Sequence, residues 1–521
     1  MTRQKEYPMM QPHSPQIDAP SSPNSATSST INSLTSEKTL VSFTPVADIQ
    51  PEACASSAHS ARHWAVSRKV AVSLGAITCF LVVTLTTSIY IASIPGIMAE
   101  FQVGRTLAIL PVTLYALGFA IGPMCTSALS EEFGRQYVYK ISLLLHFAFT
   151  LWGGFARNFC TIAVCRAISG LVGSPSVSVF AGVLNDLWQM PEDRLGVPLF
   201  VLYGLGGAAA PEIGPVIGEA VVAVYGWRSS FWLTAILVGA CILGMICVPE
   251  TFEPEILRKK LKLPRRDPRK ALAPAFLRPI HLLWAEPIVL PTAAIVTMSQ
   301  IVIFILYAGY PVILERTYQF SPYQVGLAFL PILVGTLLAA PVLSMVDRRK
   351  RRLNRSVPED NLPGAMLAAI LLPISLLWLA WTARPMVHWI CPLLAGIPYG
   401  LGFALSQLSY PLYKNEVYGA ELGASAIAVD VAMRYLFSSV FPLFTIDLID
   451  SIGFDWTMTA CAVVMMVLTP VPWLLQKFGA QLRSRSRYAK KVPIMTGQQN
   501  ESREATRGDD GTVFSAPYSP V

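Results

Sequence analysis

The sequence is dominated by a succession of apolar runs, each about 20 residues long or more. A bilayer core is crossed by a helix of about 20 apolar residues, and only helices and closed barrels satisfy their backbone groups in lipid. The runs therefore predict an all-α membrane protein with about twelve transmembrane helices. They lie near residues 70–97, 106–127, 138–156, 161–184, 197–222, 230–248, 287–313, 324–346, 364–383, 386–411, 421–446 and 457–475. Charged residues make up only 14% of the chain, against about 25% in soluble domains, which also indicates that most of the surface faces lipid.

Basic residues gather in alternate connections between these runs, which predicts the orientation. One group follows the eighth run, and others lie in the connection after the sixth run and behind the last run. Because Lys and Arg are enriched in cytoplasmic loops, we expect both termini and the central connection on the cytoplasmic side of a cell membrane. An even number of spans agrees with this orientation and argues against a receptor with an odd number.

Composition divides the chain into five segments. The first, 1–66, is rich in Ser, Thr and Pro and is expected to be a disordered cytoplasmic tail. No cleavable signal peptide is expected, because the first apolar run starts only near Val70 and is long enough to span. The others are a six-helix lobe at 67–250, a cytoplasmic connection at 251–286, a second six-helix lobe at 287–476 and a C-terminal tail at 477–521. Two such lobes are typical of alternating-access carriers, in which the substrate cavity lies between the lobes.

Short motifs follow one another in order along the chain. After the second run comes GPMCTSALSEEFGRQ (122–136), the fourth contains RAISGLVGS (166–174), and the fifth contains GLGGAAAPEIGPVIGE (204–219). The later motifs are YGWRSSFW (225–232), VPETFEPEILRKK (248–260), LRPIHLLWAEP (277–287), LYAGYPVI (306–313), PEDNLPGAM (358–366), ASAIAVDVAMR (424–434) and FPLFTIDL (441–448). Any one of them is weak, but the ordered succession is specific.

Over about residues 70–490 these motifs resemble the fungal drug:proton antiporter branch of the major facilitator superfamily, which includes multidrug, polyamine and secondary-metabolite exporters. The resemblance implies a major facilitator fold, proton coupling and export of small organic molecules. In the loop signature of that superfamily Glu131, Gly134 and Arg135 match, whereas Ser127 replaces the usual first glycine. These residues are expected to form a cytoplasmic latch that stabilises one conformation. Arg166 matches the RxxxG element, with a transport role and a helix-holding role both open.

The segment around Gly214 and Pro215 resembles the GPxxG signature of antiporters, which favours export. Its glycines and prolines permit close packing and a bend of the helix. Glu219 departs from that pattern, which commonly has glycine at this position. A sugar-porter PETKG motif is absent, since Phe252 follows Pro-Glu-Thr, and this argues against an uptake facilitator, which stays an alternative.

Ionisable residues inside spans are costly and usually functional. The candidates are Arg166, Glu212, Glu219, Asp430, Arg434 and Asp447. Glu212, within the antiporter element, is the first candidate for the proton carrier, because loss of hydration favours the protonated form of a carboxylate. A packing role and a cation-binding role remain open for it. Glu219 and Asp430 are the reserve candidates.

Asp430 and Arg434 are four residues apart on one helical face, so we expect an ion pair between them; a separate protonatable role for Asp430 remains open. Asp447 is expected near the outer interface. Tyrosines that lie within spans could contact a flat or cationic substrate, or could pack in the core. They are Tyr90, Tyr115, Tyr203 and Tyr307.

Other classes of membrane protein lack support in the sequence. The nine cysteines and six histidines form no metal-ligand spacing, and neither a GxSxG elbow nor a Walker A motif is present. We therefore expect no enzyme activity, no cofactor and no metal. The expected partners are the lipid bilayer, protons and a small-molecule substrate, with no nucleic acid, and the protein is expected to be a monomer. Substrate identity is not encoded in any motif, and a polyamine exporter stays an alternative.

Overall fold

Apolar runs fold into long helices throughout the computed structural model, which describes residues 61–188, 193, 195–262, 281–353, 357–486 and 488–489. In those residues the secondary structure is helical, without strands. The side chains of residues 127, 128, 131 and 420–424 lie outside the described part. Most of the two predicted tails lies outside it as well, so the structure does not test their expected disorder.

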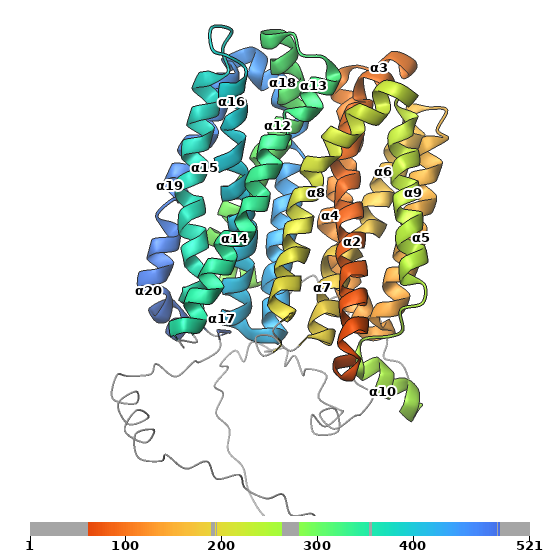
Figure 1. The fold of residues 1–521 in the computed structure, drawn as a ribbon, viewed down its shortest axis with the longest axis vertical. Helices are drawn as coiled ribbons and strands as arrows, with labels where there is room; N and C mark the ends of the chain where they lie inside the picture. Colours follow the sequence, from red (N-terminus) through yellow and green to blue (C-terminus); the bar gives the residue numbers. More distant parts are fainter. Residues whose placement is uncertain are drawn as a thin grey trace, which may run out of the picture. The chain divides into compact units, whose positions relative to one another are not determined.

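The N-terminal lobe is built from helices α2 to α9 (Figure 1). The first span runs through α2, a short 3-10 turn and α3. Its successors are α4, α5, the consecutive helices α6 and α7, then α8 and α9. Their bounds are α2 (Val66–Ile89), η2 (Tyr90–Ser93), α3 (Ile94–Phe101), α4 (Arg105–Phe133), α5 (Arg135–Gly154), α6 (Phe159–Gly173), α7 (Pro175–Leu187), α8 (Gly196–Tyr225) and α9 (Arg228–Met245).

The C-terminal lobe is built from helices α12 to α20. The long α17 is two helices joined at Gly419, whose φ of 72° interrupts the helical geometry. Its second part and α18 form the eleventh span, with a bend of 46° between them. The bounds are α12 (Val289–Tyr318), α13 (Pro322–Leu327), α14 (Leu330–Leu353), η3 (Pro358–Asn361), α15 (Leu362–Thr382), α16 (Ile390–Leu394), α17 (Gly396–Ser438), α18 (Phe441–Ile452), α19 (Phe454–Leu468) and α20 (Val471–Arg485).

The span count agrees with the sequence prediction. In the described residues, 10 helices are long and apolar enough to cross a membrane, and the bent pair 425–438 and 441–452 brings the number to 11. We count α5 as the remaining span: Lys140 and His146 lower its hydropathy, but it packs beside α6 and α9 within the bundle. The all-α fold with about twelve membrane helices is confirmed.

Some predicted boundaries are wrong. The last span continues as α20 to Arg485, so the expected start of the tail at residue 477 falls inside a helix. The eleventh span reaches Ile452 rather than residue 446. The central connection contains a short amphipathic helix, α10 (Glu253–Leu261), and its first residue, Thr251, donates from its hydroxyl to Asp186 of the N-terminal lobe.

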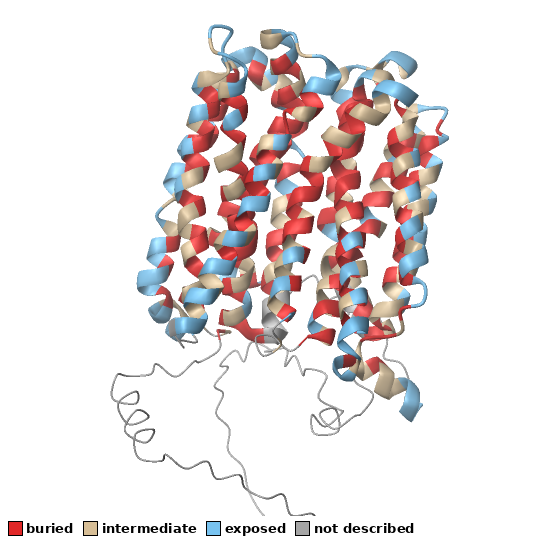
Figure 2. Cartoon of the chain, viewed as in Figure 1, coloured by how far each residue is buried: buried red, intermediate tan, exposed pale blue. Residues whose placement is uncertain are grey.

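Glycines bring pairs of helices close together inside both lobes. A Cβ at Gly170 of α6 would lie 2.1 Å from the carbonyl oxygen of Tyr115 on α4. Likewise, a Cβ at Gly400 of α17 would lie 2.0 Å from the carbonyl oxygen of Ile332 on α14. Such small-residue contacts are the usual way for membrane helices to pack, because lipid supplies no hydrophobic drive between them. Buried residues line the inward faces, whereas exposed residues gather on peripheral helices and at the helix ends (Figure 2).

Candidate functional sites

Glu212 of α8 joins the two lobes through a hydrogen bond. Its Oε1 accepts from the hydroxyl of Thr336 on α14 at 2.8 Å, and both side chains are fully buried. Its Oε2 has no hydrogen-bond partner, and no ion pair to Glu212 is present in the described residues. Tyr307 and Tyr399 lie within electrostatic range of the carboxyl group. The carboxyl group thus lies buried in the contact between the lobes. In the described residues, its one hydrogen bond is to a neutral hydroxyl group.

Small residues allow α8 to pack closely on both sides of Glu212. A Cβ at Gly214 would lie 2.0 Å from Ser88 Oγ on α2. On the other side, a Cβ at Gly326 of α13 would lie 2.9 Å from the carbonyl oxygen of Pro215 and 3.0 Å from Glu219 Cβ. Glu219 is buried against this second lobe as well. The predicted close packing of the GPxxG segment is therefore present, and it brings both carboxylates of α8 to the lobe interface.

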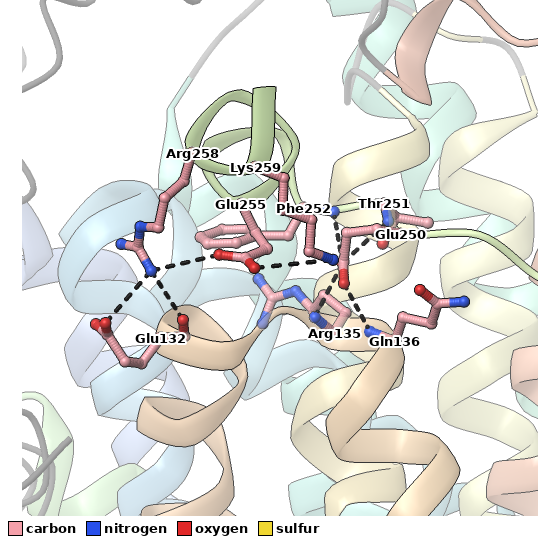
Figure 3. Close-up of polar contacts among 9 residues, drawn as sticks. All are labelled: Glu132, Arg135, Gln136, Glu250, Thr251, Phe252, Glu255, Arg258 and Lys259. Carbon is pink, nitrogen blue, oxygen red and sulfur yellow. Dashed lines mark hydrogen bonds and ion pairs between the residues drawn. The ribbon is translucent and has the colours of Figure 1, made fainter. Parts of the chain in front are cut away.

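A polar cluster at one end of the N-terminal lobe is centred on Glu250, in the segment after α9 (Figure 3). Its Oε1 accepts from the backbone N–H of Arg135 at 2.9 Å, and its Oε2 accepts from that of Gln136 at 3.1 Å. It also accepts from the N–H groups of Thr251 and Phe252. A carboxylate in this position caps the first turn of α5, where unpaired N–H groups and the helix dipole favour negative charge.

Arg135 connects this cap to a neighbouring helix. Its Nε donates to Asp186 Oδ2 of α7 at 3.1 Å, and its Nη1 donates to Ser130 Oγ at 2.9 Å. Gly134 has a φ of 90°, and a Cβ there would lie 2.3 Å from Glu250 Oε2. Two of the three predicted latch residues, Gly134 and Arg135, therefore belong to the cluster. The side chain of Glu131, the third, lies outside the described residues.

A second ion-pair group extends the same cluster to α10. Arg258 donates to the carbonyl oxygen of Glu132 at 2.9 Å, to the carboxylate of Glu132 at 3.3 Å and to Glu255 Oε2 at 3.3 Å (Figure 3). We call Glu132, Arg135, Asp186, Glu250, Glu255 and Arg258 the N-lobe latch. It ties the α4–α5 turn to the end of α7, to the segment behind α9 and to α10.

Arg166 is buried between helices α2, α4 and α6. Its Nη1 donates to the carbonyl oxygen of Thr86 at 2.8 Å, next to the point where the first span changes from α-helix to a 3-10 turn. Its guanidinium lies 4.2 Å from the ring centre of Tyr115 and 5.1 Å from that of Tyr90. In the described part of the chain, no ion pair to a carboxylate accompanies it. Arg166 therefore holds the first and fourth spans together, which agrees with the helix-holding alternative and leaves its transport role open.

Three of the four candidate substrate tyrosines use their hydroxyls within the protein. Tyr90 donates to the carbonyl oxygen of Ala108 at 3.1 Å, Tyr115 to that of Val83 at 2.8 Å, and Tyr203 to that of Ser176 at 2.6 Å. These contacts favour the packing interpretation. Tyr307 differs, because its buried hydroxyl has no hydrogen-bond partner and it lies near Glu212.

The expected ion pair between Asp430 and Arg434 is wrong. Asp430 instead accepts from the ammonium group of Lys414, and both groups are almost fully buried. Arg434 donates to the side-chain oxygen of Gln407. The two residues do share one helical face, but a closer cation from the preceding span occupies the carboxylate. Asp447 lies on α18, close to the end of the eleventh span.

Several residues of these sites were not predicted from the sequence. Thr336 carries no charge, and Lys414 lies just beyond the predicted end of the tenth span. Asp186 and Glu250 lie at span ends, where charged residues are ordinary. Only a three-dimensional arrangement brings Asp186 and Glu250 to Arg135, 51 and 115 residues away in sequence.

Comparison with known proteins decides the family. The sequence signature of the Major Facilitator Superfamily matches residues 76–442. The chain belongs to the major facilitator superfamily. Polyamine transporter 4 of Saccharomyces cerevisiae is 31% identical over 472 residues, which cover 82% of this chain and 71% of the relative. The major facilitator superfamily multidrug transporter mdrA of Aspergillus fumigatus is 31% identical, over 82% of this chain and 73% of the relative. Efflux pump FUB11 of Gibberella moniliformis is 30% identical, over 84% and 77%.

Solved structures show the same fold. The human organic anion transporter MFSD10 superimposes with a TM-score of 0.59 at 15% sequence identity, over 78% of this chain and 99% of that one. The xylose transporter XylE of E. coli, in a partially occluded inward-open conformation, gives a TM-score of 0.56 at 15% identity, over 79% and 99%. This major facilitator protein is therefore a multi-pass membrane transporter rather than an enzyme, and its curated relatives include fungal efflux pumps.

Proposed function

We propose that this major facilitator protein exports small organic molecules from the cytoplasm in exchange for protons, with Glu212 as the proton-carrying group. The observation that carries the proposal is the Glu212–Thr336 hydrogen bond between the lobes. A carboxylate without a cationic partner is strongly disfavoured in a buried site when ionised. The closed contact therefore favours the protonated form, whereas exposure to water favours the ionised form. Proton binding and lobe movement are coupled for that reason.

Export as the direction of transport rests on the relatives and on the antiporter element. The relatives mdrA and FUB11 are named a multidrug transporter and an efflux pump. The Gly214–Pro215 segment, which resembles the antiporter signature, forms the close contact on both sides of Glu212. In the proposed cycle the two lobes, residues 67–250 and 287–476, move relative to each other, and the plasma membrane holds the protein with both termini in the cytoplasm.

The test replaces Glu212 by glutamine, which keeps the shape and cannot release a proton. A substrate is first selected by the growth of pump-deficient yeast that expresses the protein on a panel of toxins. Uptake of that compound into inside-out vesicles with an acidic interior is then measured. Glu212→Gln should abolish pH-driven accumulation, whereas exchange of labelled for unlabelled compound without a gradient should persist.

Glu219→Gln is the matched control, because Glu219 is a buried carboxylate on the same helix that also faces the second lobe. If Glu212 carries the proton, Glu219→Gln keeps gradient-driven accumulation. Normal pH-driven accumulation by Glu212→Gln, at equal protein abundance, would assign the proton to another group, and loss with Glu219→Gln alone would identify Glu219 as that group.

A polyamine is the second candidate cargo. One relative is named a polyamine transporter, and two buried carboxylates of α8 face the C-terminal lobe, where they could bind an ammonium group. Spermidine in the same vesicles separates the two candidates. Polyamine export predicts saturable spermidine uptake that competes with the selected compound, and either Glu212→Gln or Glu219→Gln should raise its KM.

A further inference from the structure

The chain folds back on itself directly behind the last span. Ser486, the first residue after α20, donates from its hydroxyl to Glu286 Oε1 at 2.8 Å. Glu286 stands just before α12, and its Oε2 accepts from the hydroxyl of Tyr418 at 3.0 Å. Beyond the turn, Ala489 is buried, and Tyr488 contacts the His281 ring with ring centres 5.8 Å apart. We call Glu286, Tyr418, Ser486, Tyr488 and Ala489 the C-terminal clasp.

The Ser486 hydroxyl is the central group of this clasp. Besides donating to Glu286, its oxygen accepts from the backbone N–H of Ala489 at 2.8 Å and from that of Tyr488 at 3.1 Å. One side-chain oxygen therefore shapes the turn and fastens it to the start of α12. Glu286 is only 2% exposed, so a group that replaces the hydroxyl hydrogen meets the carboxylate without intervening bulk water.

The sequence around Ser486 has the pattern that Arg-directed protein kinases select by charge. Arg483 precedes it by three residues and Arg485 by one. Ser484 lies in the same helix end but has Gln481 three residues before it, and its exposed hydroxyl donates to the carbonyl oxygen of that residue. Ser486 thus has both an arginine three residues before it and a bond that fastens the turn. Ser484, two residues earlier, has neither of these features.

We propose that Ser486 is a phosphorylation site and that its phosphorylation opens the C-terminal clasp. A protein kinase would transfer the γ-phosphoryl group of ATP to Ser486. The Ser486 Oγ–phosphorus bond forms, the bond between the γ-phosphorus and the bridging oxygen of ADP breaks, and the hydroxyl proton passes to the base of the kinase. The reaction takes place on the transiently open segment, since terminal segments open locally at low cost. This phosphorylation rests on the cytoplasmic position of the C-terminal end that is part of the proposed function.

Charge explains why the phosphorylated segment would stay open. A phosphoserine carries close to two negative charges at neutral pH and lacks the donor hydrogen that now binds Glu286. In the closed clasp it would lie beside a buried carboxylate, which is strongly unfavourable. In the open segment it can pair with Arg483 or Arg485. Arg483 is bound to Glu359 in the closed structure, so this exchange would also loosen the contact between α20 and η3.

The clasp connects the ends of three spans of the C-terminal lobe, because Glu286, Tyr418 and Ser486 belong to the seventh, tenth and twelfth. Its opening would remove the bonds that keep these ends together while the lobe moves as a body. We therefore expect phosphorylation to lower the turnover of transport severalfold, with little change in the KM of the substrate, because the clasp joins span ends whereas Glu212 lies in the contact between α8 and α14.

The experiment uses the full-length protein in lipid nanodiscs, incubated with ATP and a cyclic-AMP-dependent protein kinase. Mass spectrometry of the peptides released by cleavage after lysine, which keep Ser484 and Ser486 together in the fragment 478–490, should locate phosphate on Ser486 and not on Ser484. Opening is measured by maleimide labelling of Ala489→Cys, in a variant whose native cysteines are replaced by alanine. Phosphorylation should raise the labelling rate at least fivefold, Ser486→Asp should raise it as well, and Ser484→Asp, the matched control, should leave it unchanged.

A second variant tests the charge mechanism itself. Glu286→Gln removes the repelling charge and supplies a donor, so Ser486→Asp combined with Glu286→Gln should label more slowly than Ser486→Asp alone. Absence of phosphate on Ser486, or labelling of Ala489→Cys that phosphorylation does not change, would overturn the proposal. These readouts need neither a substrate nor a proton gradient, so they are independent of the outcome for Glu212.

Discussion

Two buried carboxylates of this transporter have different surroundings, and the difference separates their roles. Asp430 faces the ammonium group of Lys414, whereas Glu212 faces the neutral hydroxyl of Thr336. A paired carboxylate keeps its charge and stabilises helix packing, because removal of either partner leaves an uncompensated buried charge. A carboxylate that has only a hydroxyl partner can exchange a proton without losing an ion pair. This contrast supports Glu212 as the proton carrier over Asp430.

The Lys414–Asp430 pair gives a prediction at the level of single residues. Lys414→Ala and Asp430→Ala should each destabilise the protein, on the order of 3–5 kcal/mol as for other buried pairs, and the double variant should be less destabilised than their sum. The measurement is thermal unfolding of the purified variants, arranged as a double-mutant cycle. Arg434→Ala is the comparison: its coupling to Asp430→Ala should be weaker than that of Lys414→Ala, because Arg434 is bound to Gln407. Stronger coupling of Asp430 to Arg434 than to Lys414 would contradict the Lys414–Asp430 pair.

The sequence alone predicts which spans contain charge but not which charges meet. Glu212 and Asp430 are conspicuous because carboxylates are rare in apolar runs, and both are buried as expected. Lys414 was missed because the tenth span continues several turns beyond the end that hydropathy indicates. Thr336 was missed because a hydroxyl is common in membrane helices and carries no periodic signal. Which buried polar side chains meet depends on how each helix is rotated about its axis and on which helices touch. A single sequence specifies neither.

At the scale of helices, the N-lobe latch fastens the beginning of α5. A buried carboxylate, Glu250, caps this helix from a segment more than 100 residues away, and Arg135 extends the contact to α7. The loop signature predicted that Gly134 and Arg135 act together near a helix end. It did not predict the cap itself, because Glu250 lies at the very end of the lobe segment, beyond α9 and far from Arg135 in sequence.

Removal of the Arg135 side chain should weaken the latch without unfolding the lobe. Arg135→Ala keeps the backbone N–H that Glu250 accepts from, so α5 stays capped, but the bond to Asp186 is lost. We expect surface abundance within about twofold of wild type and transport slowed severalfold, since such ion pairs bias the switch between conformations. Export rate per surface molecule is the measurement. Unchanged turnover at equal abundance would remove Arg135 from the gating mechanism.

At the scale of the whole molecule, the two lobes meet along α8 on one side and along α4 on the other. α8 contacts α13 and α14, while Thr113 of α4 donates to the carbonyl oxygen of Ser439, beyond the end of α17, at 2.7 Å. Hydropathy and Lys/Arg bias predicted the number of spans and the division into lobes. The faces that touch across the interface could not be predicted, because a helix that is apolar all round has no preferred side.

A substitution at Gly326 tests the contact between the two lobes. Gly326→Ala would place a methyl group 2.9 Å from the Pro215 carbonyl oxygen and 3.0 Å from Glu219 Cβ, both on the opposite lobe. Because that carbonyl is backbone, the lobes must separate slightly, and we expect the conformation described here to become less populated. Distances between spin labels on the two lobes should lengthen, and export should slow severalfold. Gly244→Ala, whose Cβ meets nothing within 4 Å, should change neither; equal effects of both variants would contradict this account.

The kink at Gly419 has a consequence for how the protein is made. Lys414 and Asp430 are 16 residues apart, on opposite sides of that kink. A lone charged lysine or aspartate adds about 2.5–3.5 kcal/mol to the free energy of insertion at the centre of a span and less toward its ends, where Lys414 and Asp430 lie. As the ribosome delivers the tenth and eleventh spans in succession, the turn lets them enter the lipid as one hairpin, with the two charges already neutralising each other. Glu212 has no such companion, and like any carboxyl group it can insert in its uncharged form, long before Thr336 has been synthesised.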